Sequence, residues 1–514
     1  NPVSFGSVNF EGKILTLGSA STELKLTDAN TALSLSGIAL ETGPGSLTLS
    51  GALTMSGNSK LNSSGGTITL NSGGSASSGT EISLPDTTLV LQNALSLAGA
   101  TLKTKNTTLT TNDKALSLSS SSILEVDGTQ DLSGVSPDNS TTLRLAANST
   151  VGGNTSLSVG TLELADFALT LNDQMAGLNV SQALTLDAAT EQIITGGADL
   201  SLNGGATVNA GTLSSTGGTL SASSYSVGAA GTVNIQGGTL TLPAGGTAVT
   251  GAAFTTSGTT ISLGGTLEVA NTWTSDNTSV SLTDNASLSS TATLALATLT
   301  TNGHDFDLDS VTTDLTLANA FTLSAGKMST HGADLIFESS ADISSDSTLD
   351  AGDGGKFEFK QGGTANGTIN AESAVFKIGA AYAVPGTLKT NSSTTWDLAS
   401  NLDLSGGKLE LGGTVTLDKV LTDNGTTFKL GEDATVTRNQ GFTLGSLDLD
   451  NSTFTLGSAT TDLTLDLSDC SGTCNSPIGS LATGTADLTI LGAITVTSGT
   501  TISSTGGTFT FGNG

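Results

Sequence analysis

Positive charge is scarce in this chain of 514 residues, which has 16 Lys and Arg against 45 Asp and Glu and a formal net charge of -29. Proteins that bind nucleic acids draw much of their affinity from clustered Lys and Arg. Here the 182 residues between Arg144 and Lys327 contain neither. We therefore exclude a nucleic-acid partner and, for the same reason, binding to an anionic membrane surface.

Long apolar runs and aromatic residues are also few. No apolar run approaches the roughly 18 residues that a membrane-spanning helix needs, so we expect no membrane insertion. Charged residues make up only 12% of the chain, whereas a disordered tail needs high charge and few apolar groups. Trp273 and Trp396 are the only tryptophans, too few to line a carbohydrate groove. Trp273 falls on an apolar repeat, and we expect it in the core.

Regularly spaced apolar residues dominate the pattern instead. They recur every six or seven residues, and every third one falls about twenty residues further on. Between Leu200 and Leu299 the pattern forms three series: Leu200, Leu220, Leu240, Ile261, Val280 and Leu299; Leu213, Val233, Phe254, Trp273 and Leu294; Val208, Val227, Val249, Leu267 and Leu288. Three short strands in each coil of about twenty residues predict an all-β fold, a parallel β-solenoid.

Within one coil, alternation separates the core from the surface. In Leu240-Thr241-Leu242 the leucines point one way and the threonine the other, because side chains alternate across a strand. Gly-Gly pairs such as Gly237-Gly238 predict the corners, since glycine reaches positive φ at low cost. The pattern is less regular over residues 126–155 and 340–400, where we expect longer corner loops. No linker divides the chain, so we predict one continuous solenoid over residues 1–514.

The two cysteines, Cys470 and Cys474, lie close together in sequence. Both histidines, His304 and His331, are more than a hundred residues away, which argues against a metal site, and no nearby base would activate a catalytic thiol. We expect a disulfide that closes a corner loop over residues 468–478 in an oxidising compartment, with a free thiol pair as the alternative.

Acidic residues form two candidate calcium sites. Asp305, Asp307 and Asp309 alternate with Phe306 and Leu308, which places three carboxylates on one outer face. The second group is Asp448 and Asp450, with Asp462 and Asp466 about one coil further on. Stacked carboxylates repel one another unless a cation bridges them, and Ca²⁺ prefers oxygen ligands. The alternative is a solvated acidic face without any cofactor.

Leu-Thr-Leu strands, Gly-Gly corners, a twenty-residue coil and uniform acidity together resemble long repetitive bacterial surface proteins. The similar families are filamentous-haemagglutinin-like adhesins and autotransporter passenger domains. The resemblance implies a right-handed β-helix that is secreted and acts as a stalk, adhesin or surface filament. Because the chain begins at Asn1 without an initiator Met or a signal segment, we expect a processed or excerpted chain.

The leading functional hypothesis is a non-enzymatic extracellular fibre or stalk that associates end to end with itself or belongs to a longer chain. An adhesin that binds glycans of a host or neighbouring cell is the alternative. A polysaccharide-degrading enzyme is less favoured, because its groove would need basic or aromatic partners for the acids. An ice-binding face is least favoured, because outward Thr residues alternate with Ser, Asn, Asp and Lys without a sustained match.

Overall fold

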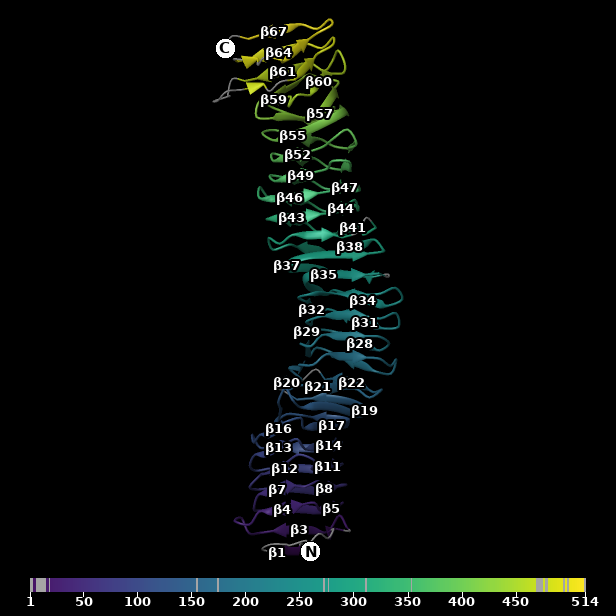
Figure 1. Ribbon diagram of the computed structural model, residues 1–514, viewed down its shortest axis with the longest axis vertical. Helices are drawn as coiled ribbons and strands as arrows, with labels where there is room; N and C mark the ends of the chain where they lie inside the picture. The colour runs from purple at the N-terminus through teal and green to yellow at the C-terminus, as the bar shows by residue number, and fades with distance from the viewer. Residues whose placement is uncertain are drawn as a thin grey trace. The chain divides into compact units, whose positions relative to one another are not determined.

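The computed structural model confirms the predicted fold class. The described residues are 3–5, 15–17, 19–153, 156–172, 175–270, 273–275, 277–309, 312–352, 354–467, 475–476, 479–492, 495–496 and 499–512. They form an all-β parallel solenoid of about 22 turns, with about 21 residues per turn and no helix (Figure 1). Accordingly, none of them forms a helix long and apolar enough to cross a membrane.

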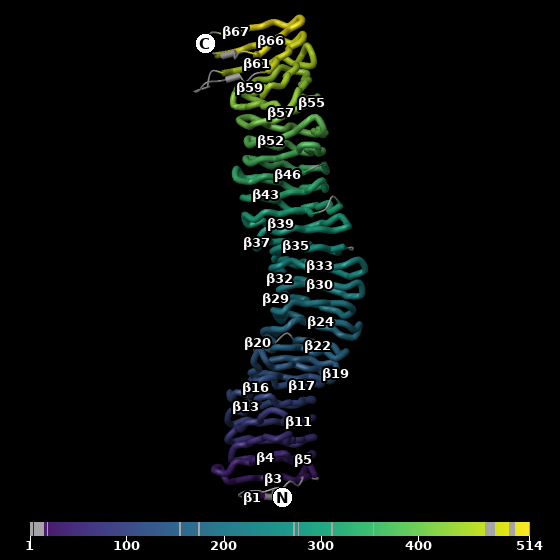
Figure 2. Tube along the Cα trace, viewed as in Figure 1, coloured from purple at the N-terminus to yellow at the C-terminus, as the bar shows by residue number. Residues whose placement is uncertain are grey.

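Contacts between residues divide the chain into two compact units, Asn1–Thr260 and Ile261–Gly514. Coils stack on their sequence neighbours within each unit, as the trace in Figure 2 shows. That residues 1–514 form one continuous domain remains a prediction.

Over residues 23–131 of the first unit, each coil adds one strand to each of three parallel sheets; further along the unit, two strands of each coil join one sheet. One sheet contains β3 (Glu23–Leu26), β6 (Ser46–Leu49), β9 (Thr67–Leu70) and β12 (Thr88–Leu91). The second contains β4 (Leu33–Ser36), β7 (Leu53–Ser56), β10 (Gly74–Ala76) and β13 (Leu95–Ala98). The third contains β5 (Ala39–Gly43), β8 (Lys60–Ser63), β11 (Glu81–Pro85), β14 (Thr101–Lys105) and β17 (Ile123–Asp131).

The apolar series predicted from the sequence become columns of stacked core residues. Leu200, Leu220 and Leu240 are in register and at most 1% exposed. They lie on β26 (Asp199–Leu202), β29 (Thr219–Ala222) and β32 (Thr239–Leu242). Trp273 is buried as expected.

One member of the third series was predicted wrongly. Val227, on β30 (Tyr225–Val227), is in register with Ala248, the last residue of β33 (Gly245–Ala248). Ala248 therefore takes the inward position, and the following residue, Val249, is 43% exposed because neighbouring side chains alternate.

The two irregular stretches are not longer loops. In the first, β17 and β19 (Thr142–Gly152) are long strands that pair in two segments, with a register shift between Val126 and Gly128. In the second, Thr348, Thr368 and Thr387 lie in register at steps of 20 and 19 residues (368 minus 348 and 387 minus 368). The aliphatic pattern is hard to detect there because Phe and Ala fill the core. Buried examples are Ala341, Phe357, Phe359, Ala365, Ala371, Ala374 and Phe376.

The second unit contains a six-stranded sheet that ends before the unit does. Its strands, in order, are β38 (Leu294–Leu296), β41 (Leu315–Leu317), β44 (Leu335–Phe337), β47 (Lys356–Phe359), β50 (Val375–Ile378) and β53 (Thr395–Leu398). On β47 both phenylalanines are fully buried, whereas Lys356 and Glu358 are partly exposed. Stacked rings continue the core from coil to coil, with Phe337 and Phe359 centroids 5.0 Å apart.

Hydroxyl groups supply nearly all of the buried polarity. Among the described residues the buried polar side chains are Ser and Thr, with Gln130 as the exception. Many donate to a carbonyl about one coil earlier: Thr259 Oγ1 to Ile235 O at 3.0 Å, and Thr426 Oγ1 to Leu404 O at 3.1 Å. A short hydroxyl can satisfy a buried carbonyl without bringing a charge into the thin core.

Candidate functional site

Charged side chains on the first unit form a ladder along the third sheet. Its members occupy successive coils and alternate in sign: Lys60, Glu81, Lys103, Glu125, Arg144 and Glu163. Lys103 Nζ lies 3.1 Å from a Glu81 carboxylate oxygen and 3.9 Å from one of Glu125. Arg144 Nε donates to Glu163 Oε2 at 2.6 Å. Neighbouring strands are about 4.8 Å apart, so outward residues can pair between coils. Lys103 pairs in register with Glu125 but diagonally with Glu81, because the residue in register with Lys103 on that side is Ser83.

A second ladder runs along one sheet of the second unit. Its strands are β40 (Phe306–Leu308), β43 (Gly326–Ser329), β46 (Ser347–Asp350), β49 (Thr368–Asn370), β52 (Thr387–Lys389), β55 (Lys408–Thr416), β57 (Thr427–Thr437) and β59 (Ser446–Asp448). The residues in register are Asp307, Ser329, Asp350, Asn370, Lys389, Glu410, Lys429 and Asp448, of which Ser329 is buried.

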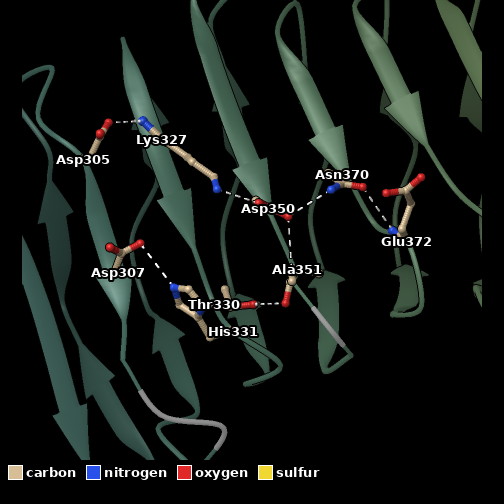
Figure 3. A network of polar contacts seen from close by, with 10 residues as sticks. Asp305, Asp307, Lys327, Thr330, His331, Asp350, Ala351, Asn370 and Glu372 are labelled. Atoms are coloured by element: carbon tan, nitrogen blue, oxygen red, sulfur yellow. Dashed lines mark hydrogen bonds and ion pairs between the residues drawn. The ribbon is translucent and has the colours of Figure 1, made fainter.

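Asp350 is the most connected carboxylate of this ladder (Figure 3). It receives Lys327 Nζ at 2.7 Å, Asn370 Nδ2 at 3.0 Å and the Gly352 backbone N–H at 3.1 Å. Burial disfavours its charge, but these donors outweigh burial and lower the pKa of Asp350. The Asp350 carboxylate therefore links three neighbouring segments of the chain.

The first candidate calcium group lies beside this ladder. As expected, Phe306 and Leu308 are buried, while Asp305 and Asp309 are exposed and Asp307 is partly exposed. Asp305 Oδ1 accepts a hydrogen bond from the Lys327 backbone N–H at 2.7 Å. In Figure 3 Asp307 points toward His331, whose Nε2 is 3.6 Å from Asp307 Oδ1. Two of the three carboxylates therefore already have protein partners.

Asp305 and Asp307 also line a shallow depression. The other lining residues are Gly265, Thr266, Asn285, Ala286 and Ser287. Its wall contains hydroxyl, amide and carboxylate oxygens but no base or aromatic ring.

The second candidate calcium group is spread over two sheets. Asp448 is in register with Lys429 on the second ladder, and Asp450 Oδ2 is 3.8 Å from Lys429 Nζ. Asp466 belongs to β61 (Leu463–Asp466), in a different sheet. Asp462 Oδ1 accepts from the Asp487 backbone N–H at 2.9 Å. Across the described parts of the chain, no three His, Cys, Asp or Glu side chains gather where they could hold a metal ion. Calcium binding by either group remains a prediction.

Many aspartates have a structural role that the sequence interpretation missed. A carboxylate at the start of a strand, or within it in the case of Asp342 and Asp433, accepts the backbone N–H of the equivalent position in the next coil. The acceptors and donor residues are Asp199 and Thr219, Asp305 and Lys327, Asp314 and Asp334, Asp342 and Thr364, Asp433 and Thr453, Asp462 and Asp487, and Asp487 and Thr508. The available signal was the recurrence of Asp at the coil period before a strand.

The disulfide prediction cannot be placed. Cys470 and Cys474 lie outside the described residues, as does most of the loop over residues 468–478.

No protein-family profile, curated protein or solved structure matches this chain. The assignment as a β-solenoid repeat protein therefore comes from the coil architecture itself.

Proposed function

We propose that this protein is a non-enzymatic structural scaffold that acts outside the cell. The observation that carries the proposal is the pairing of charge between coils. Lys60, Lys103, Lys327 and Lys429 all lie within 4.0 Å of a carboxylate in a neighbouring coil. These side chains stabilise coil stacking and do not converge on a reacting centre. The resemblance to repetitive surface proteins supports the extracellular location and an adhesin-like role.

A hydrolytic function is tested with a panel of acidic and neutral polysaccharides. We expect no release of reducing ends, because the depression at Asp305 and Asp307 lacks a buried acid, a base and an aromatic platform. Release that disappears in Asp307→Asn, but persists in a matched Asp342→Asn variant on another face, would contradict the proposal.

End-to-end association is part of the proposed scaffold role. β67 (Phe509–Phe511) pairs with β64 (Leu488–Leu491), which aligns Phe509 with Leu488 and Phe511 with Ile490. Those two partners are 1% exposed, whereas Phe509 and Phe511 are 38% and 66% exposed. Two aromatic side chains at core positions therefore offer an apolar surface on which a further coil, from a second copy or from a longer chain, can stack.

Electron microscopy of the purified 514-residue chain tests this association. We expect filaments in which β-stacking continues between copies. The double variant Phe509→Asp, Phe511→Asp should abolish them, while Thr510→Asp, on the intervening outward position, should leave them intact. Separate particles for the unaltered chain, or filaments that survive the double variant, would contradict self-association through this coil.

A further inference from the structure

Two core columns of the second unit reach the surface at residues 396 and 398, well before the unit ends. The first consists of Leu294, Leu315, Leu335, Phe357, Phe376 and Trp396 in consecutive register, and the second of Leu296, Leu317, Phe337, Phe359, Ile378 and Leu398. Every member before the last is at most 1% exposed. Trp396 and Leu398, on β53, are only half-buried.

The reason is a break in the sheet. β53 is the last strand of its six-stranded sheet, and no described strand pairs with its far edge. In the next coil, Gly413–Thr416 belongs to β55, which pairs forward with β57. The sheet ladder is interrupted here, and the indole of Trp396 rests edge-on against Phe376, with centroids 5.9 Å apart.

A depression of about 200 Å³ opens at this break, lined by Trp396, Leu398, Thr416, Asp418 and Lys419. Two apolar side chains thus lie beside one carboxylate, one ammonium and one hydroxyl. Asp418 is held by Asn439, whose backbone N–H donates to Oδ1 at 2.7 Å and whose Nδ2 donates to Oδ2 at 2.6 Å. Each carboxylate oxygen retains a second lone pair that can accept from a ligand hydroxyl.

Two hydrogen bonds also hold the Lys419 side chain in place. Its Nζ donates to Leu398 O at 2.7 Å and to Ala399 O at 2.8 Å, which leaves the third ammonium proton as a donor for a ligand. Because these contacts occupy the carbonyls at the end of β53, an added peptide strand would have to displace the lysine. The geometry therefore disfavours β-strand addition.

Size distinguishes between the remaining occupants. A stable contact with a second protein copy buries roughly 800 Å² per partner, more than one shallow depression provides. Pockets for drug-sized ligands measure roughly 300–1,000 Å³, so this smaller depression suits a single ring. A ligand with one apolar face for the indole and several hydroxyls for Asp418 and Lys419 matches the wall.

We propose that the break at β53 is a binding subsite for one pyranose ring, with the sugar's C–H face on Trp396 and its hydroxyls bonded to Asp418 and Lys419. This is a single subsite rather than the aromatic-lined groove that the tryptophan content excludes. The proposal does not depend on the scaffold role, because a sugar subsite can function on an isolated chain or on a fibre.

The test is saturation-transfer NMR of the full chain with the methyl glycosides of glucose, galactose, mannose and N-acetylglucosamine, together with acrylamide quenching of tryptophan. Trp273 is 4% exposed and provides a protected internal reference. We expect at least one glycoside to give saturation transfer and to shield Trp396 from acrylamide. Asp418→Asn should weaken binding about tenfold, as expected when a hydrogen bond to a charged group is lost. Trp396→Leu should abolish it.

Asp403→Asn is the matched control, because Asp403 lies on β54 (Leu402–Asp403), does not line the depression, and its carboxylate accepts a hydrogen bond from the nearby Ser405 backbone N–H. It should leave affinity unchanged. If Trp396→Leu fails to fold, Asp418→Asn still tests the site. No saturation transfer with any glycoside, equal weakening by Asp403→Asn, or shielding of Trp396 by self-association in sedimentation runs would overturn the proposal.

Discussion

Leu240 and Thr241 are neighbours in β32 with opposite environments: Leu240 is fully buried, whereas Thr241 faces outward and is only partly covered. Leu240 belongs to a buried column with Leu200 and Leu220, so a charge placed there would lie among aliphatic side chains that cannot pair with it.

Leu240→Asp should therefore destabilise the surrounding coils by about 3–5 kcal/mol, the cost typical of an uncompensated buried charge. Limited proteolysis should reveal new cleavage near β32. Thr241→Asp is the control, and the protease should cleave this variant as it cleaves the unaltered chain. Equal protease resistance of both variants would show that position 240 does not face inward.

Glu358 makes stability depend on pH. Its side chain is 12% exposed, and the Nζ atoms of Lys356 and Lys377 each lie 3.2 Å from it. Burial opposes its ionisation, but the two lysines outweigh burial and lower the pKa of Glu358. Since the unfolded state then binds more protons, the stabilisation is complete above the unfolded pKa and is lost as pH falls through the folded pKa.

Thermal unfolding should follow that sign, with a midpoint that falls on acidification below about pH 4.3, the ordinary pKa of Glu. Glu358→Gln should lower the thermal midpoint at pH 7, because each lost ion pair removes up to about 1 kcal/mol from the free energy of unfolding. It should also make the dependence of the midpoint on acid pH shallower. The exposed Glu372→Gln serves as control and should change neither quantity. An unaltered acid slope in Glu358→Gln would refute this role.

At the scale of strands and corners, Gly238 combines two demands. Its φ is +67°, and a Cβ there would lie 2.1 Å from Gly218 O of the preceding coil. Gly258 has a positive φ of +59° but open space around it, and Gly197 has open space without a positive φ. A comparison of the three positions therefore distinguishes the cost of a positive φ from the cost of a close contact between coils.

The loss of stability caused by alanine should increase from Gly197 to Gly258 to Gly238. We expect Gly197→Ala to be neutral, Gly258→Ala to cost about 1 kcal/mol, and Gly238→Ala to cost more, because neighbouring backbone must also move. Urea unfolding midpoints of the three variants measure the ranking. Equal midpoints for Gly258→Ala and Gly238→Ala would mean that coil stacking tolerates the added methyl group.

Periodic strands were predictable from the sequence because alternation and spacing are local properties. Leu200, Leu220 and Leu240 recur at a fixed interval, and parallel stacking makes that interval the register. Val249 was misplaced because an alanine one position earlier satisfies the same interval with less hydrophobicity. The break at β53 was not predictable, since Trp396 follows the same alternation as the buried residues beneath it. The exposure of Trp396 depends on whether a strand of the next coil pairs with β53.

The site chemistry was less predictable than the fold. Clusters such as Asp305, Asp307 and Asp309 are conspicuous in sequence, but their partners lie one coil away. Lys327 and His331 contact the first two through stacking, not through sequence proximity. A search for acidic residues that ignores the register between coils therefore overestimates the number of carboxylates without a protein partner.

At the scale of the whole molecule, those partners make a metal unnecessary for coil stacking. Dialysis against EDTA should leave the thermal midpoint unchanged, and Ca²⁺ titration calorimetry should show no heat. The measurement covers both carboxylate groups, because either would raise the midpoint on binding. A rise with Ca²⁺ that is lost in Asp305→Asn, but kept in the more distant Asp433→Asn, would instead establish a calcium site.

Since each coil aligns with the next in register, the length of this protein can change only in whole steps. Removal of residues 213–232 would join Thr212 to Val233 and place Val233 above Ile193, where Leu213 stands now. Leu200 would likewise lie beside Leu240 in place of Leu220, an equivalent residue of the next coil. Removal of one residue fewer would turn the following strand inside out. Tandem duplication or loss of such a block offers evolution a way to lengthen or shorten the protein without inventing a new core.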